Sequence, residues 1–177
     1  MLVDTPPELR LQLIAAGVSA VDAVWFTHIH ADHVHGIDDL RVFTARRGDV
    51  DAYIASEYRE KIARYFEYIF DEAVQAAPGS SIPSVKLHEL EEGRPVGIVG
   101  ESFTPLLVPH GPTNVYGFRV GKLGYITDGK RLPPTTLEAL KGVDVLVLNA
   151  LWFGRPHPSH FNIEEAIEAA REVGAER

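Results

Sequence analysis

The chain has 177 residues, of which 45% are hydrophobic, and this composition favours a globular domain with a substantial core over a disordered chain. Its 25 acidic and 17 basic residues give a formal charge of −8, which disfavours a nucleic-acid partner. No cysteine is present, so disulfides are excluded. No apolar run approaches the roughly 20 residues that span a bilayer, and no secretory signal opens the chain, so we expect a cytoplasmic protein without a membrane partner.

Strand and helix signals alternate in the first part of the chain. Residues 1–5 resemble a strand, and Pro6-Pro7 introduces a short helix that ends at Gly17. The apolar run 23–26 is typical of a buried strand. Later predicted elements are a helix through Leu40 and Phe43 to Arg47, a strand over 51–55, a helix over 57–70 and a loop over 75–84.

The second part of the chain is rich in strand signals. Strands are predicted over 85–87, 96–99, 103–108, 115–120 and 123–127, with Gly121-Lys122 as a hairpin turn. A helix over 133–140 and a buried strand over 143–148 follow. The closing helix has Asn162 as its N-cap, Glu165 in a capping-box arrangement and Gly174 as its stop. Its predicted apolar face contains Ile163, Ala166, Ile167, Ala170 and Val173.

A histidine-rich segment, Thr27-His28-Ile29-His30-Ala31-Asp32-His33, directly follows the run 23–26. His28 and His30 are two apart, so on an extended backbone they point the same way, whereas Asp32 and His33 diverge where the chain begins to coil. One short segment can therefore supply ligands to two neighbouring cations. Imidazole and carboxylate without thiolate suit zinc, manganese or iron. A chance histidine-rich loop is the alternative, and the strand context disfavours it.

Two later predicted strands also end in residues that bind metals. His110 ends the run 106–110, and Asp128 ends the run 123–128 just before Gly129. Taken alone, each is more often a turn residue than a ligand. In company with the histidine-rich segment we expect both to be ligands, because loops at strand ends assemble sites on a rigid sheet.

Together these residues resemble the metallo-β-lactamase superfamily of dinuclear metallohydrolases. The extension Gly36-Ile37-Asp38-Asp39-Leu40-Arg41 is similar to one branch of it. That branch contains the phosphoribosyl cyclic phosphodiesterase of the carbon–phosphorus lyase pathway and is related to the tRNA 3′-processing endonucleases. The resemblance covers essentially the whole chain. It implies an α/β fold, the four-layer αββα sandwich, in a single domain over residues 1–177.

The resemblance also implies which residues hold two divalent ions, zinc or manganese. His28, His30 and His110 would hold one ion, Asp32 and His33 the second, and Asp128 would bridge both. Relatives begin with a β-hairpin region and carry a final histidine after a last strand, and neither has a match here. An alternating fold would also place a strand after the closing helix. We therefore expect the domain to be short at both termini.

Two further histidines, His157 and His160, lie in a proline-stiffened segment after the predicted strand 143–148. The alternative for both is an ordinary surface histidine. In the phosphodiesterase relatives, a histidine just before the last helix acts on the substrate phosphate; His160 best matches it, with His157 in reserve. An imidazole titrates near neutrality, so it can protonate a leaving alkoxide. Arg41 is a candidate substrate contact, with support or capping of the helix as its alternative.

The resemblance implies a dinuclear metal-dependent phosphodiesterase that attacks a small phosphodiester, cyclic ones included, with a metal-bridged hydroxide. One alternative is a tRNA 3′-processing-type endonuclease, although no basic insertion or flexible arm is found. The other is a catalytically impaired metal-binding protein, because the last histidine ligand has no match. The natural substrate, the identity of the metals and the oligomeric state, a homodimer included, are left open.

Overall fold

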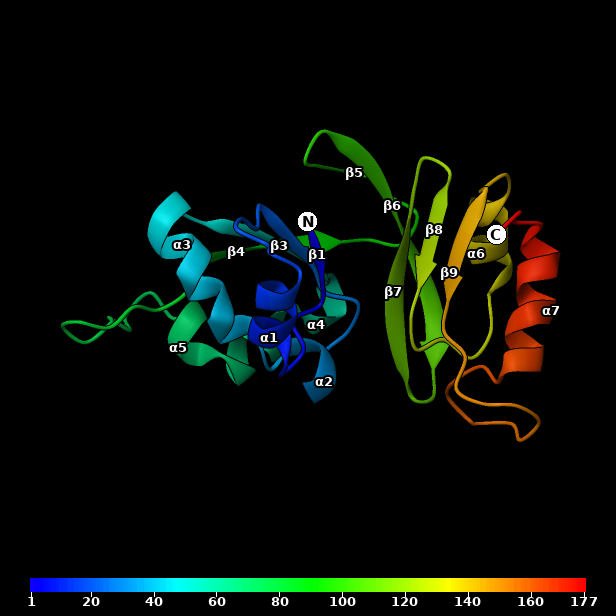
Figure 1. The fold of residues 1–177 in the computed structure, drawn as a ribbon, viewed down its shortest axis with the longest axis horizontal. Coiled ribbons are helices and arrows are strands. Elements are labelled where there is room, and N and C mark those ends of the chain that lie inside the picture. Colours follow the sequence, from blue (N-terminus) through cyan, green and yellow to red (C-terminus); the bar gives the residue numbers. More distant parts are fainter. The chain divides into compact units, whose positions relative to one another are not determined.

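The computed structural model describes residues 1–177, which form two compact units, Met1–Leu90 and Glu91–Arg177. Each unit contains one β-sheet with its own helices (Figure 1). The predicted α/β class is therefore confirmed. That residues 1–177 form a single domain stays a prediction.

The first unit is built on a four-stranded parallel sheet in the order β1-β2-β3-β4. Its strands are β1 (Leu2–Val3), β2 (Ala23–Trp25), β3 (Val50–Ala55) and β4 (Val85–Leu90). Its helices are α1 (Leu9–Ala15), α2 (Ala31–Val34), the 3-10 helix η1 (Ile37–Leu40), α3 (Arg41–Arg47), α4 (Ser56–Tyr65) and α5 (Glu67–Phe70). Every residue of β2 is buried, as expected for an interior strand of a parallel sheet. The parallel direction places the carboxyl ends of β1, β2 and β3 at one edge.

One predicted helix of this unit is interrupted. The helix expected over 57–70 is two helices, because the backbone leaves the helical region at Phe66, with φ −124° and ψ 46°. The Phe66 ring is buried, and its centroid lies 6.2 Å from that of the His35 ring in a T-shaped arrangement. Packing of this ring therefore overrides the helical periodicity of the local sequence.

The second unit contains a five-stranded sheet in the order β5-β6-β7-β8-β9. Its strands are β5 (Val96–Ile98), β6 (Glu101–His110), β7 (Thr113–Val120), β8 (Leu123–Ile126) and β9 (Val145–Leu148). The first four pair antiparallel, whereas β9 runs parallel to β8. The predicted hairpin turn at Gly121-Lys122 is confirmed, and Gly121 has φ +53°, the positive value that a type II′ turn needs at its first central position.

Helices α6 (Pro134–Leu140) and α7 (Ile163–Val173) pack against this second sheet (Figure 1). The core between them contains Leu106, Val108, Ile126, Leu140, Val143 and Val173. Two expectations were wrong here. Val147 of the predicted buried strand is 44% exposed, because β9 is the last strand in the sheet order, and Ile167 of the predicted apolar face is 45% exposed. Ala169 and Val173 are the buried residues of α7.

The start of α7 confirms the predicted capping box. Asn162 Oδ1 accepts a hydrogen bond from the Glu165 backbone N–H at 2.8 Å, and Glu165 Oε2 accepts one from the Asn162 N–H at 3.0 Å. Lys130 Nζ also donates to Glu165 Oε2, at 2.6 Å. The hydrogen bond from Lys130, aided by the Asn162 N–H, lowers the pKa of Glu165 below its ordinary value. Glu165 thus links the helix start to the turn that contains Lys130.

This link predicts a pH-dependent contribution to stability. Because the folded-state pKa of Glu165 is lowered, the Lys130–Glu165 pair stabilises the fold at pH values above about 4.5, the ordinary pKa of the group. The contribution is lost as the pH falls further, through the folded-state value. Lys130→Met should therefore lower the free energy of unfolding by up to about 1 kcal/mol at pH 7 and by much less at pH 3, measured by urea denaturation.

The control is Lys141→Met, which removes the lysine of an exposed ion pair. Its partner Glu138 lies within α6, and Lys141 directly follows the last residue of that helix. We expect that variant to have little effect at either pH. An equal loss for Lys130→Met at pH 3 and pH 7 would contradict the electrostatic origin of the stabilisation.

Candidate metal centre and active site

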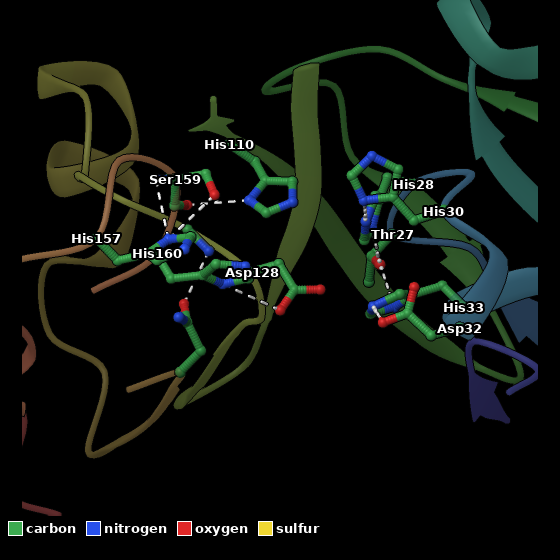
Figure 2. Close-up of polar contacts among 12 residues, drawn as sticks. Thr27, His28, His30, Asp32, His33, His110, Asp128, His157, Ser159 and His160 are labelled. Carbon is green, nitrogen blue, oxygen red and sulfur yellow. Dashed lines mark hydrogen bonds and ion pairs between the residues drawn. The ribbon is translucent and has the colours of Figure 1, made fainter. Parts of the chain in front are cut away.

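The histidine-rich segment leaves the carboxyl end of β2, and α2 begins directly after His30, as the sequence predicted. His28 is buried, and its Nε2 lies 2.9 Å from Nδ1 of His30 (Figure 2). Two nitrogens bound to one tetrahedral zinc ion at 2.0–2.1 Å would lie about 3.3 Å apart. The pair therefore fits two ligands of a single cation with little adjustment.

His33 is oriented by Asp4, a residue that the sequence analysis did not single out. Asp4 Oδ2 lies 2.7 Å from Nδ1 of His33, and it also accepts a hydrogen bond from Thr27 Oγ1 at 2.8 Å. Asp4 Oδ1 accepts from the Thr27 backbone N–H at 2.8 Å. A carboxylate that accepts from one ring nitrogen of a histidine leaves the other nitrogen as the metal ligand. Asp4 therefore favours the tautomer of His33 that binds a metal through Nε2.

Thr27 favours one tautomer of His28 in a similar way. Its hydroxyl donates to Asp4, so its oxygen can accept a hydrogen bond from His28 Nδ1, which is 3.1 Å away. That arrangement leaves Nε2 of His28 as the ligand nitrogen. The rings of His28 and His33 lie 4.2 Å apart, with ligand atoms within 4.8 Å. One buried carboxylate thus sets the tautomers of two histidines.

The backbone of Asp4 is strained and firmly held. Asp4 has φ +60°, a left-handed value that is uncommon outside glycine. Its N–H donates to the Trp25 carbonyl at 2.8 Å, and the next N–H, of Thr5, donates to the His33 carbonyl at 2.7 Å. Burial raises the pKa of the Asp4 carboxyl, and the hydrogen bonds from His33 and Thr27 oppose that rise. Strain that is fixed from several sides is typical of functional sites.

Asp32 and Arg41 lie beside this cluster in the sequence but have different surroundings. Asp32 is exposed on α2, with Oδ2 3.5 Å from Nε2 of His33. Arg41, at the start of α3, pairs with Asp38, whose Oδ1 accepts a hydrogen bond from Tyr68 at 3.1 Å. Burial, followed by this contact with Asp38, raises the pKa of Tyr68 to about 12. The structure therefore shows Arg41 engaged by Asp38, and its role toward a substrate stays a prediction.

The second unit brings four of the predicted site residues together: His110, Asp128, His157 and His160 (Figure 2). His110 ends β6, and its Nδ1 lies 3.0 Å from the carbonyl oxygen of Ser159. Since a carbonyl only accepts, this contact places the proton on Nδ1 and leaves Nε2 as the ligand atom. The His160 ring lies 4.6 Å from the His110 ring and 5.0 Å from the His157 ring.

Asp128 occupies a tight turn after β8. Its φ is +52°, and its Oδ1 lies 3.5 Å from Nδ1 of His160. The next residue, Gly129, has no space for a side chain, because a Cβ there would lie 2.6 Å from Val108 Cγ1. The Gly129 carbonyl accepts from the Phe161 N–H at 2.8 Å. The turn that carries Asp128 is thus connected to the segment that carries His160.

Sequence reasoning found the residues that follow strands in recognisable motifs, and it missed two that support them. Asp4 carried a usable signal, since it follows an apolar strand as Asp128 does. Asn149 carried the same positional signal, because it directly follows β9, but the sequence did not indicate that its Oδ1 accepts a hydrogen bond from the Gly129 N–H at 2.8 Å. The roles assigned to the ligands and to His157 and His160 stay predictions.

Comparison with known proteins decides the family. Residues 1–177 match the family described as "Beta-lactamase superfamily domain". The chain belongs to this superfamily. The predicted resemblance and the metallo-β-lactamase-like fold are thereby confirmed. Among solved structures, the superfamily member is similar to a diphosphatase of the PhnP family, with 31% identity, a TM-score of 0.83 and coverage of 98% of this chain and 64% of that one.

More distant structures share the fold alone. The metallo-β-lactamase fold protein YhfI from Bacillus subtilis is 18% identical, with a TM-score of 0.77 over 98% of this chain and 69% of that one. Zn(2+)-bound PqqB from Methylobacterium extorquens is 18% identical, with a TM-score of 0.68 over 91% of this chain and 64% of that one. The histidine and aspartate clusters described above consist of side chains of the types that bind divalent metals.

Curated relatives extend beyond the matched region. An octanoyltransferase of Porphyromonas gingivalis is 32% identical over 174 residues, which are 98% of this chain and 34% of that protein. A ribonuclease Z of Mycobacterium sp. is 27% identical over 98% of this chain and 70% of that protein. The chain thus spans about a third of the first relative.

The family and the diphosphatase likeness support a metal-dependent hydrolase. None of the helices has the length and apolar character needed to cross a membrane.

The role of Asp4 predicts a loss of metal affinity in Asp4→Asn. An amide can donate to Nδ1 of His33, which would favour the tautomer with its proton on Nε2, and that nitrogen then cannot bind a metal. Asparagine tolerates the positive φ, so the fold should persist. We expect the affinity for Zn²⁺ to fall about 10- to 100-fold, measured by competition with a chromophoric chelator.

The matched control is Thr5→Val. Thr5 is buried next to Asp4, and its hydroxyl donates to the Val34 carbonyl at 3.1 Å without touching a histidine ring. This variant should lose stability and retain Zn²⁺ affinity. Equal Zn²⁺ affinities for Asp4→Asn and the unmodified protein would refute the orienting role.

Proposed function

We propose that this superfamily member is a dinuclear metal-dependent phosphodiesterase that hydrolyses a small phosphodiester, cyclic ones included. The observation that carries the proposal is the placement of His160 against Asp128 and His110, which puts an imidazole, a side chain that can donate a proton, beside two candidate metal ligands. The likeness to a PhnP-family diphosphatase at 31% identity supports phosphate chemistry.

The proposed ligands are those that the family resemblance implies. His28, His30 and His110 would hold one ion, Asp32 and His33 the second, and Asp128 both. When bound, zinc or manganese would supply Lewis acidity toward a phosphate and lower the pKa of a coordinated water from about 15.7 to roughly 7. Asp4 and the Ser159 carbonyl support this assignment, because they leave Nε2 of His33 and of His110 for metal binding.

His160 is the proposed proton donor. Hydrolysis forms a bond between phosphorus and the water oxygen, and the water releases one proton to the solvent. The bond to the leaving alkoxide breaks, and the alkoxide takes its proton from the imidazolium of His160, which the solvent then reprotonates. A cyclic diester would open to a phosphomonoester. Asp128 lies 3.5 Å from Nδ1 of His160, and a carboxylate in this position stabilises the protonated ring. His157 and Arg41 are proposed to contact the substrate.

A tRNA 3′-processing activity is the second candidate, because a ribonuclease Z of Mycobacterium sp. is 27% identical over 98% of this chain. The formal charge of −8 disfavours it. Absence of tRNA binding at 50 mM salt, where contacts to the phosphate backbone are strongest, would dismiss this candidate. The octanoyltransferase likeness covers 34% of that protein, so acyl transfer is not proposed. Metal binding without turnover is the third candidate.

Asp128→Asn tests the metal-dependent function. The amide keeps the shape of the side chain and tolerates the positive φ, but it lacks the negative charge of the carboxylate that zinc and manganese bind. We expect turnover of bis(p-nitrophenyl) phosphate to fall to background and the metal content after dialysis to drop from two ions to one or none, measured by plasma mass spectrometry. Two retained ions with full turnover would contradict the proposal.

His160→Ala tests the proton donor with two substrates. An alkyl phosphodiester has a poor leaving group and needs protonation, whereas p-nitrophenolate leaves without it. We therefore expect kcat to fall about 100-fold or more for the alkyl diester and much less for bis(p-nitrophenyl) phosphate. Metal content should be unchanged. His157→Ala is the matched control and should affect both substrates alike; metal loss in His160→Ala would show that the role is misassigned.

A further inference from the structure

The side-chain amide of Asn149 is fixed in one orientation. Asn149 directly follows β9, and its Oδ1 accepts a hydrogen bond from the backbone N–H of Gly129 at 2.8 Å. Its Nδ2 is buried and has no hydrogen-bond partner. Turning the amide over would set its NH₂ group against the Gly129 N–H, so the observed orientation is the one that the contact allows.

An amide with one buried, unpaired donor destabilises the fold at this position. A residue of similar size without that donor would avoid this loss of stability. A buried donor without a partner in a folded protein therefore calls for an explanation. The explanation here lies at the other end of the amide. Oδ1 satisfies the N–H of the residue that follows Asp128, the proposed bridging ligand.

The turn at Asp128 needs support of this kind. A non-glycine residue with φ +52° persists only where its surroundings fix it from several sides. The turn is fixed at Gly129 by Asn149 and by the Phe161 N–H, and at Lys130 by the Pro109 carbonyl, which accepts from the Lys130 N–H at 3.1 Å. The contact from Asn149 comes from a side chain, so a substitution can remove it while the backbone contacts remain.

The same residue begins the segment that carries His160. Leu151, two residues after Asn149, donates its N–H to the Phe161 carbonyl at 3.0 Å, and this bond closes the loop that contains His157 and His160. Phe161 in turn donates its N–H to the Gly129 carbonyl at 2.8 Å. Asn149 therefore binds the N–H of Gly129, and Phe161 binds its carbonyl. These two residues lie at the two ends of one loop.

We propose that Asn149 is a positioning residue, which holds the Asp128–Gly129 turn so that the Asp128 carboxylate is presented for metal binding. The inference rests on the proposed function, because it takes Asp128 to be a metal ligand. Asn149 acts through the main chain of its neighbour and touches neither a metal nor a substrate in this role.

The test compares two substitutions of Asn149 in the full chain. Asn149→Leu has a similar size but no acceptor, whereas Asn149→Asp keeps an oxygen for the Gly129 N–H. We expect Asn149→Leu to weaken Zn²⁺ binding about 10-fold or more and to lower kcat for bis(p-nitrophenyl) phosphate with little change in KM. Asn149→Asp should recover most of the lost affinity. In the metal-free protein, the amide proton resonance of Gly129 should move upfield in Asn149→Leu and stay near its original position in Asn149→Asp.

Thr136→Val is the matched control for stability. Thr136 is buried in the same unit, and its hydroxyl donates to the Leu107 carbonyl at 2.7 Å. The control should be destabilised and retain Zn²⁺ affinity. Unchanged Zn²⁺ affinity in Asn149→Leu would overturn the inference, and so would an equal loss in Asn149→Asp, which would indicate packing alone. Should Asn149→Leu not fold, Asn149→Ala takes its place with the same readouts.

The inference and the proposed function fail in distinguishable ways. If Asp128→Asn retains both ions and turnover, the proposed function is overturned, and the role of Asn149 with it. If Asp128→Asn loses metal while Asn149→Leu does not, Asp128 remains a ligand and the positioning role of Asn149 is overturned alone.

Discussion

Parallel strand pairing is the constraint on which the cluster of candidate site residues in each unit depends. In the first unit, β1 pairs with β2 so that Val3 lies opposite Trp25, and the residues just beyond them, Asp4 and Thr27, then meet through two hydrogen bonds. In the second unit, β8 and β9 pair with Ile126 opposite Leu148. Parallel strands end at a common edge, so polar residues placed one or two positions past each strand become neighbours.

Electrostatics explains why a bound cation would suit the polar clusters at these edges. Asp4 is buried, and burial raises the pKa of its carboxyl, which is a measure of how unfavourable a lone charge would be there. A cation bound through His33 would offset that cost, because the positive charge would lie across the imidazole from the carboxylate. In a chain with a formal charge of −8, such ions would also supply the local positive charge that an anionic substrate needs.

The sequence was most informative where a signal is local. The hairpin at Gly121-Lys122 and the capping box of Asn162 and Glu165 depend on residues next to one another in the chain, and both were predictable. The position of the histidine-rich segment between β2 and α2 was equally predictable, whereas the roles of its residues stay predictions. The break at Phe66 was not predictable, since it depends on where a buried ring packs. The role of Asn149 was not predictable either, because it depends on a hydrogen bond to Gly129, twenty positions earlier in the chain.

The acceptor that fixes the tautomer of His110 is the main-chain carbonyl of Ser159. Every amino acid carries such a carbonyl, so the side chain at this position is free to change without loss of the contact. The path of the loop is not free, since a Cβ on Gly111 would already approach the Ser159 Cβ to 3.2 Å. Substitutions in the loop that contains Ser159 should therefore be tolerated as related proteins diverge, whereas insertions or deletions in it should be selected against.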